Sequence, residues 1–389
     1  MAEFGIIGST VPGQHIMANK FFPIALKVKG VKARAANILK QEMLSRMGDA
    51  VISRENLLKM ESLTDVIIFG TEKSLRSLAE KIKLQPFGLK NLSEEIILYL
   101  SELSRSKSKK TISIKEKTFD LSIEGPLIMG ILNITRDSFY DGGAYFFKKQ
   151  YMARIEEIVS QGAHIIDVGG MTTRPGSKPV SVQEELSRVI PAITAISKKY
   201  DILISVDTYR SEVAKQAVGA GAAIINDISG FTMDDAMPGT AASTGASVVI
   251  MHMQGTPENM QNDPVYEDVV DEIYDFLFDQ AEKAKAAGVA REKIIIDPGI
   301  GFGKNLEHNL EIIARLSDFT NMGYPVLFGA SRKSFIGAIL GGVGASERLE
   351  GSLAAAVYSY INGASILRVH DVAQTVAAVK VAKSIREII

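Results

Sequence analysis

The sequence predicts an α/β protein in which a (β/α)8 TIM barrel over residues 121–389 follows a smaller α/β domain over residues 1–120. Two observations predict the barrel. Eight short apolar runs recur with helix-compatible segments between most of them, and a polar or charged residue follows each run. A chain of 389 residues has room for such a barrel, which takes about 250 residues, and for one smaller domain.

The composition excludes several classes of protein. Hydrophobic residues make up 46% of the chain, charged residues 23%, and the formal net charge is −1, so neither a disordered chain nor a strongly basic nucleic-acid binder is expected. Cysteine is absent, which excludes disulfides, thiol catalysis and thiolate-bound metals. No uncharged apolar stretch of about 18 residues and no signal-peptide pattern are present, so we expect no membrane span and a cytoplasmic location.

The first 120 residues show mixed helix and strand patterns. Residues 32–47 and 92–103 have helical spacing, and the apolar run 65–69 indicates a strand. Thr71 is placed to cap a helix that follows this strand. The polar run 101–110 is typical of a linker between two domains.

Eight barrel strands are expected where apolar residues run together. These runs are 127–133, 165–168, 202–206, 223–226, 247–251, 294–296, 325–328 and 365–369. The clearest helical segments are 182–199, 211–218, 266–287, 349–361 and 372–388. Continuous apolar strands that alternate with helices indicate parallel strands covered on both faces, and eight such units indicate closure into a barrel. An open doubly wound sheet is the alternative arrangement of these elements.

Polar side chains stand at the carboxyl end of each predicted strand. They are Asn133, Asp167, Asp207, Asn226 with Asp227, His252, Asp297, Lys333, and Arg368 with His370. In a barrel these ends converge on one face, so the side chains are expected to ring a single mouth. Two have ordinary structural explanations as well: Asp227 could cap the next helix, and His252, between two methionines, could be a core histidine.

The side chains at the mouth are of two chemical kinds. Asp207, Asn226, Asp297 and Lys333 offer the acceptors and donors that suit a flat, nitrogen-rich heterocycle, because an ionised carboxylate accepts two N–H bonds side by side. Asn133, Arg368 and His370 offer two potential cations and an oxygen ligand, which suit a phosphate or diphosphate together with Mg²⁺.

Three glycine-containing loops follow predicted strands and are candidates for function. Residues 135–143 and 169–176 follow the first two strands and have the composition of mobile lids, although solvated connections have it too. Residues 299–304 look like a phosphate loop but lack the Walker A spacing and the Ser or Thr after the lysine.

The chain from about residue 127 to 389 resembles the dihydropteroate synthase family, pterin-binding enzymes of folate biosynthesis. The segments that carry the resemblance are MGILNITRDSFYDGG (129–143), DVGGMTTRPG (167–176), SVDT (205–208), INDI (225–228), DPGIGFGK (297–304), SRKS (331–334) and RVH (368–370). They occur in order across nearly the whole predicted barrel. Three residues depart from the usual family pattern in the two lids: Arg136, Tyr140 and Met171.

The resemblance implies a role for each matching residue. Pterin binding falls to Asp207, Asn226, Asp297 and Lys333, with Arg332 beside the ring. Diphosphate binding falls to Asn133, Arg368 and His370, with Asn133 also near Mg²⁺. The lids and the p-aminobenzoate pocket contain Asp137, Asp141, Thr173, Arg174, Pro175, Phe302 and Ser334. Among these we expect Lys333, Asp297, Arg368 and His370 to act in catalysis.

The implied reaction condenses p-aminobenzoate with (7,8-dihydropterin-6-yl)methyl diphosphate to give 7,8-dihydropteroate and diphosphate. The expected partners are these small molecules and a second copy of the chain, with Mg²⁺ as cofactor and without nucleic acid or membrane. The alternatives are a methyltetrahydrofolate-dependent methyltransferase on the same kind of barrel and a non-catalytic pterin-binding module. Residues 1–120 lie outside the usual minimal enzyme of this family. The stretch QPFGL (85–89) and its surroundings resemble N-terminal extensions of some bacterial and archaeal members, and the resemblance implies no role for them.

Overall fold

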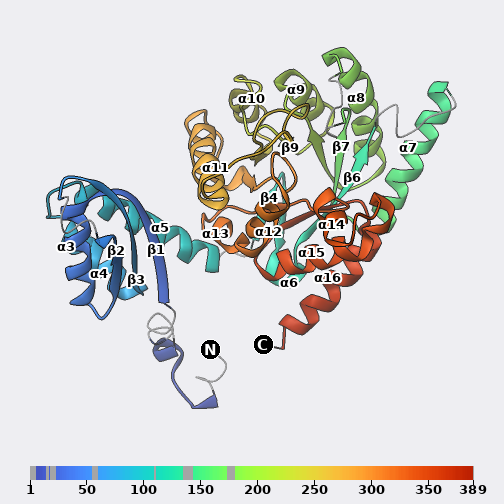
Figure 1. Cartoon of the computed structure of the whole chain (residues 1–389). Helices are drawn as coiled ribbons and strands as arrows, with labels where there is room; N and C mark the ends of the chain where they lie inside the picture. The colour runs from blue at the N-terminus through green and yellow to red at the C-terminus, as the bar shows by residue number, and fades with distance from the viewer. Residues whose placement is uncertain are drawn as a thin grey trace. The chain divides into compact units, whose positions relative to one another are not determined.

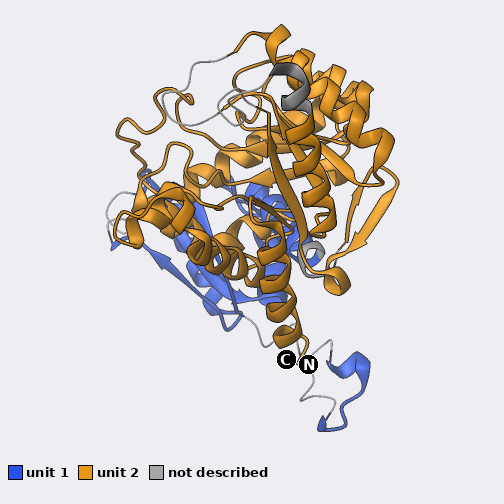
Figure 2. Ribbon diagram, turned by 90° about the vertical axis from the view of Figure 1, so that its right-hand side faces the viewer, with its two compact units in different colours: residues 1–107 blue, residues 108–389 orange. Residues whose placement is uncertain are grey.

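The computed structural model describes residues 6–14, 17, 23–54, 60–108, 111–134, 143–172 and 180–388. The chain forms two compact units, Met1–Lys107 and Ser108–Ile389, which are coloured separately in Figure 2. Within the described ranges, no helix is both long enough and apolar enough to cross a membrane.

The first unit is a three-stranded antiparallel sheet with helices on one face. Its elements are β1 (Pro23–Lys32), α3 (Ala33–Leu44), β2 (Asp49–Ile52), β3 (Leu63–Thr71), α4 (Glu72–Ile82) and α5 (Leu89–Ser108), with strand order β1-β3-β2. Alternate strand residues such as Leu26 and Ile68 pack under the helices, while Val51 and Ile67 on the other face are exposed. As predicted, Thr71 caps α4, because its side chain accepts a hydrogen bond from the Ser74 amide at 3.2 Å.

The second unit is a closed barrel of eight parallel strands (Figure 1). The strands are β6 (Leu127–Asn133), β7 (Ile165–Gly169), β8 (Leu203–Asp207), β9 (Ile224–Asp227), β10 (Ser247–Met251), β11 (Ile294–Asp297), β12 (Leu327–Phe328) and β13 (Ile366–Val369). Their order is β11-β10-β9-β8-β7-β6-β13-β12, and a parallel bridge between Ile296 and Val326 joins the two ends. The predicted (β/α)8 barrel is therefore confirmed, and the open sheet is wrong.

Helices surround the strands, because apolar strand residues that point outward need cover. They are α7 (Gly143–Ser160), α8 (Val182–Lys199), α9 (Ser211–Ala220), α10 (Met237–Thr244), α11 (Val269–Ala286), α12 (Leu306–Ala314), α13 (Leu316–Thr320), α14 (Ser334–Ile339), α15 (Leu349–Ile361) and α16 (Val372–Arg386). The strands and helices share one large core, in which Ile166, Val206 and Ile250 are fully buried.

A hairpin closes the amino-terminal end of the barrel. Strands β4 (Thr111–Ile114) and β5 (Lys117–Asp120) pair antiparallel, and the short helix α6 (Leu121–Glu124) follows. Ile112 and Ile114 pack among the first residues of the barrel strands. The hairpin therefore belongs to the barrel unit, which begins at Ser108, whereas the sequence analysis placed the boundary after residue 120. Few apolar residues of the hairpin make these contacts, namely Ile112, Ile114 and the partly buried Phe119, and the polar run before it hides them in the sequence.

We expect the floor formed by this hairpin to contribute to the stability of the barrel. Ile114 has 0% of its surface exposed. Ile114→Ala should lower the free energy of unfolding by about 2–5 kcal/mol in urea titrations followed by circular dichroism, because the vacated volume cannot refill. Val51→Ala is the control, since Val51 is 57% exposed and its loss should change stability by less than about 0.5 kcal/mol. Equal effects of the two substitutions would contradict a role for the floor.

Candidate active site at the barrel mouth

The predicted polar side chains do converge on the carboxyl end of the barrel. Asp207 and Asp297 are the last residues of β8 and β11, and Asn226 lies near the end of β9. Arg368 lies in β13, and Lys333 immediately precedes α14. Parallel pairing places Asp207 beside both Gly169 and Asn226, so residues distant in the sequence become neighbours.

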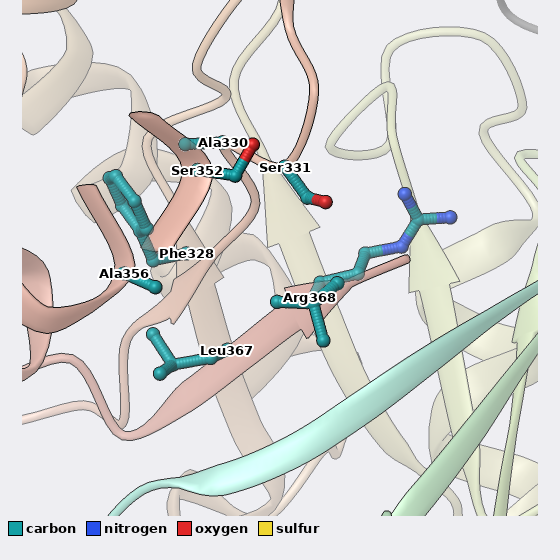
Figure 3. A pocket seen from close by; sticks show the side chains of 8 residues that line it. Phe328, Ala330, Ser331, Ser352, Ala356, Leu367 and Arg368 are labelled. Carbon is teal, nitrogen blue, oxygen red and sulfur yellow. The ribbon is translucent and has the colours of Figure 1, made fainter. Parts of the chain in front are cut away.

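Arg368 lies at the centre of this mouth and binds two carboxylates. Its Nε donates to Asp167 Oδ2 and its Nη2 donates to Asp207 Oδ2, each at 2.6 Å. Asn226 Nδ2 donates to the same Asp167 oxygen at 3.1 Å. Figure 3 shows the guanidinium extending away from Phe328 and Leu367. The cavity on that apolar side has a volume of about 10 Å³, which is too small for a substrate.

Burial changes the proton affinity of this cluster. Desolvation raises the pKa of Asp207 to about 7, although Arg368 opposes the shift and Asp167 adds to it. Burial disfavours the Arg368 cation, but Asp167 and Asp207 outweigh that effect, so the pKa of Arg368 is raised. Asp167 Oδ1 is buried and has no hydrogen-bond partner among the described residues. A buried acceptor without a protein donor has room in its hydrogen bonding for a water molecule or a ligand N–H group.

Asp297 and Lys333 form the opposite side of the mouth. Asp297 Oδ1 accepts the Gly299 amide at 2.7 Å, which turns the chain sharply after β11. Burial raises the pKa of Asp297, while Lys333 opposes that shift. Burial lowers the pKa of Lys333 to about 7 against the pull of Asp297. Lys333 Nζ donates to the Ile300 carbonyl and lies 4.5 Å from the centre of the Phe302 ring.

His370 differs from its expected role as a second cation. Its Nδ1 lies 3.1 Å from Ser331 Oγ, and its carbonyl accepts from Arg154 Nη2 at 2.6 Å. Burial, followed by the charge of Arg368, lowers the pKa of His370 to about 4. At neutral pH the imidazole is therefore uncharged, so it can offer an anion a hydrogen bond but no charge.

Arg332, which the resemblance places beside the pterin ring, forms an ion pair with Asp371. Its Nε and Nη2 bind the two carboxylate oxygens of Asp371 at 2.8 and 2.6 Å. Its backbone amide donates to Ser352 Oγ at 2.9 Å, and its φ of 57° lies in the left-handed region. This pairing fixes the turn that leads into Lys333.

The remaining predicted residues have different environments. Asn133 is exposed at the end of β6, where a Cβ on Gly169 would lie 3.2 Å from its Oδ1, so the glycine leaves that oxygen accessible. Ser334 is the exposed first residue of α14, and Phe302 is half-buried. Five predicted lid residues lie outside the described residues: Asp137, Asp141, Thr173, Arg174 and Pro175.

Two strand-end residues serve the fold. Asp227 accepts hydrogen bonds from the Ser229 amide at 2.8 Å and the Phe231 amide at 3.0 Å, so it stabilises the turn after β9. It does not cap the next helix, α10, which begins only at Met237. His252 is 7% exposed and packs edge-on against Phe276 with ring centres 4.9 Å apart. Desolvation lowers its pKa to about 2, with Lys304 adding to the shift.

Two residues of this region have environments that their sequence motifs do not indicate. Asp167 appeared at a strand end, and the signal that distinguishes it, burial beside an arginine and an asparagine, exists only in three dimensions. Lys304 was set aside together with the phosphate-loop motif. It lies 2% exposed against His252.

Comparison with known proteins identifies the class. The family model described as pterin binding enzyme matches residues 129–370. The dihydropteroate synthase of Escherichia coli (strain K12) is 48% identical over 264 residues, which are 68% of this chain and 93% of that protein. A Yersinia pestis dihydropteroate synthase in a sulfonamide drug complex has a TM-score of 0.67 and 43% identity, and the match covers 71% of this chain and 99% of that one.

A second solved structure of a dihydropteroate synthase is similar in fold to this chain to the same degree. The Xanthomonas albilineans dihydropteroate synthase with 4-aminobenzoic acid has a TM-score of 0.67 and 38% identity, and the match covers 71% of this chain and 98% of that one. The chain therefore belongs to the family of pterin-binding enzymes. Within that family it groups with the dihydropteroate synthases, which are transferases of folate biosynthesis.

Proposed function

We propose that the barrel mouth binds a (7,8-dihydropterin-6-yl)methyl diphosphate and p-aminobenzoate and joins them with release of diphosphate. The observation that carries this proposal is the buried cluster of Asp167, Asp207, Asn226 and Arg368, which contains one carboxylate oxygen without a donor. A pterin edge presents several N–H donors side by side, which is what such a cluster lacks.

The pterin ring would be held by acceptors and one donor. Asp167, Asp207 and Asp297 would accept its ring and amino N–H groups, and the Asn226 amide would complete the hydrogen bonds along that edge. Lys333, close enough to Asp297 to influence its pKa, would donate to ring acceptors. A ring without these groups would leave buried polar atoms unpaired, which costs about 1–3 kcal/mol for each atom, so the site discriminates by hydrogen bonding.

The leaving diphosphate needs positive charge and hydrogen-bond donors. Arg368 would supply a fixed charge, and His370 an N–H. No group of three or more His, Cys, Asp or Glu side chains that could hold a metal occurs among the described residues. Asn133 still fits Mg²⁺, because its exposed amide oxygen suits an ion that keeps waters and substrate oxygens as its other ligands. Bound there, Mg²⁺ would neutralise charge on the departing diphosphate.

The bond changes are simple. The amine nitrogen of p-aminobenzoate forms a bond to the pterin methylene carbon, the C–O bond to diphosphate breaks, and the amine loses a proton. Because the amine is a weak neutral nucleophile, the site must chiefly orient it and stabilise the leaving group. Phe302 and Ser334, beside Lys333, are the described residues proposed to border its pocket.

The test is diphosphate release from the pterin diphosphate in the presence and absence of p-aminobenzoate. We expect release that depends on p-aminobenzoate, with one diphosphate for each dihydropteroate formed. Release that does not need p-aminobenzoate, or transfer of a methyl group in its place, would contradict the proposal.

A cytoplasmic homodimer is proposed for the assembly. Support comes from the resemblance and from apolar side chains exposed on the last two helices: Tyr358 and Ile361 on α15, and Val381 and Ile385 on α16. Exposed apolar patches of this kind favour association.

Binding of the pterin should be strongest near neutral pH. As the pH falls through about 7, Asp207 gains a proton and loses an acceptor. As it rises through about 7, Lys333 loses its positive charge. Calorimetric affinity should therefore peak near pH 7 and fall by up to about tenfold per unit on either side. Asp207→Asn should weaken binding and remove the acidic limb. An affinity that is constant over about two units around neutrality would contradict the assignment of these two groups.

A further inference from the structure

The loop after β11, residues 299–304, is fully hydrogen-bonded although it is glycine-rich. All six of its backbone carbonyls accept a hydrogen bond. The donors to the carbonyls of residues 299 to 304, in order, are the Phe302 amide (3.1 Å), Lys333 Nζ, Gln261 Nε2 (2.7 Å), Lys304 Nζ (2.9 Å), Tyr266 Oη (2.8 Å) and Asn309 Nδ2 (3.3 Å). A loop held at every carbonyl behaves as a rigid platform, and one of its six partners is the proposed pterin-binding lysine.

Lys304 joins this loop to its neighbour. Its Nζ lies 2.9 Å from the Phe302 carbonyl, 2.9 Å from His252 Nδ1 and 3.3 Å from the His252 carbonyl. His252 follows β10, so a single side chain joins the ends of two adjacent strands. Burial, which Asp297 opposes, lowers the pKa of Lys304 well below its usual value. Three acceptors inside the protein surround its Nζ, so hydrogen bonds hold this side chain in place.

The two loops also touch through their backbones. A Cβ on Gly299 would lie 1.9 Å from the His252 carbonyl oxygen, and a Cβ on Gly303 would lie 2.4 Å from that of Gln254. Both glycines have φ near 70°, a conformation that favours glycine. The loop thus has no room to move toward β10, and Lys304 prevents it from moving away.

We propose that Lys304 and His252 are positioning residues of the pterin site: they hold the loop after β11 so that the Ile300 carbonyl and the Phe302 ring seat Lys333. Both side chains are buried, Lys304 at 2% and His252 at 7% exposed, and they act through the loop that holds Lys333. The inference rests on the proposed role of Lys333 and adds the device that orients it. A displacement of about 1 Å at a reacting centre can cost about 10²-fold in rate, so a loose platform has a large effect.

The first variant is Lys304→Met, which keeps the length of the side chain and removes all three hydrogen bonds. We expect affinity for the pterin diphosphate, measured by calorimetry without p-aminobenzoate, to fall by about 10- to 100-fold. Tyr266→Phe is the matched control, because it removes a donor to the carbonyl next to Phe302 and leaves Lys304 in place. Its affinity should stay within about threefold of the parent protein.

A pair of substitutions at His252 separates positioning from mere stability. In His252→Asn the amide oxygen can replace Nδ1 as the acceptor for Lys304, whereas His252→Leu has no acceptor. We expect the asparagine variant to retain affinity to within about threefold. The leucine variant should lose more affinity than the asparagine variant but less than Lys304→Met, because Lys304 keeps its two backbone carbonyl acceptors. The double variant Lys304→Met/His252→Leu should be no worse than Lys304→Met alone, because the contact to the imidazole is one of the three that Lys304→Met already removes.

The outcomes distinguish the positioning role of Lys304 from the proposed role of Lys333 in pterin binding. Normal pterin affinity in a folded Lys304→Met variant, with affinity lost in Lys333→Met, would overturn the positioning role and leave the proposed function intact. Normal affinity in Lys333→Met would overturn the role of Lys333 and this inference with it. If Lys304→Met fails to fold, the two His252 variants give the answer: equal affinities for asparagine and leucine would refute the inference.

Discussion

Replacing Arg368 with alanine is expected to lower kcat/KM for the pterin diphosphate by about 10³-fold and the free energy of unfolding by about 3–5 kcal/mol. Both effects have one origin. The guanidinium binds Asp167, which is 0% exposed, and Asp207, whose side chain is 12% exposed. Without it two buried carboxylates lose their counter-charge, and the leaving diphosphate loses a fixed cation.

The stability loss should depend on pH in a defined direction. Asp207 already has a pKa of about 7, and removal of the positive charge raises it further. A carboxyl group whose pKa is raised in the folded state takes up a proton as the pH falls, which relieves the repulsion. Urea titrations should therefore show a smaller loss at about pH 5.5 than at about pH 8.

Arg210→Ala is the matched control for Arg368→Ala. Arg210 is 17% exposed and binds Glu185, which is 0% exposed, at 2.8 Å, so the ion pair is as buried as that of Arg368. We expect a similar loss of stability and little change in the affinity for diphosphate measured by calorimetry. Loss of diphosphate affinity in both variants to the same extent would mean that general destabilisation, and not the charge of Arg368, explains the effect.

The barrel could be predicted because its signals are local. Each buried strand is a continuous apolar run, because it is covered on both faces. Such a strand can be identified from its own residues, without knowledge of the strands with which it pairs. Segments 182–199 and 349–361 coincide with α8 and α15. The first unit was harder, since β1 alternates buried Ile24, Leu26 and Val28 with exposed residues, and its register depends on pairing with β3. The paired residues of β1 and β3, from Lys32 with Leu63 to Pro23 with Thr71, are far apart in the chain, and such pairing leaves little trace in a single sequence.

The active site likewise has features that the sequence predicts and features that only the folded structure reveals. Strand-end residues such as Asp297 and Arg368 could be placed at the mouth because the barrel topology gathers them there. Protonation could not be foreseen: His370 is neutral because of burial and the nearby Arg368, and both are properties of the folded state. The connection from Lys304 to His252 spans 52 residues and rests on the close approach of two loops, which no motif encodes.

Lys333→Met is expected to lower kcat/KM for the pterin diphosphate by about 10²- to 10³-fold while raising thermal stability. The loss of activity follows from removing the donor to the ring. The gain in stability follows from the lowered pKa of about 7. The unfolded chain keeps its lysine protonated to about pH 10.4, so burial of the ammonium opposes folding.

The size of this gain should depend on pH. Below pH 7 the folded protein carries the full cost of the buried charge. As the pH rises above 7 the folded state releases the proton, and the cost shrinks. Melting curves should therefore show a larger increase in Tm for Lys333→Met at about pH 6 than at about pH 9.

Lys293→Met serves as the control for this substitution. Like Lys333, Lys293 donates to a backbone carbonyl, that of Gly245 at 2.5 Å. It lies just before Ile294, at the amino-terminal end of β11, whereas the mouth of the barrel is at the carboxyl end of the strands. Its replacement should leave kcat/KM unchanged and Tm without a pH-dependent gain. A Lys333→Met protein that loses stability along with activity would show that Lys333 supports the fold. In that case the proposed opposition between its binding role and its cost to folding would be wrong.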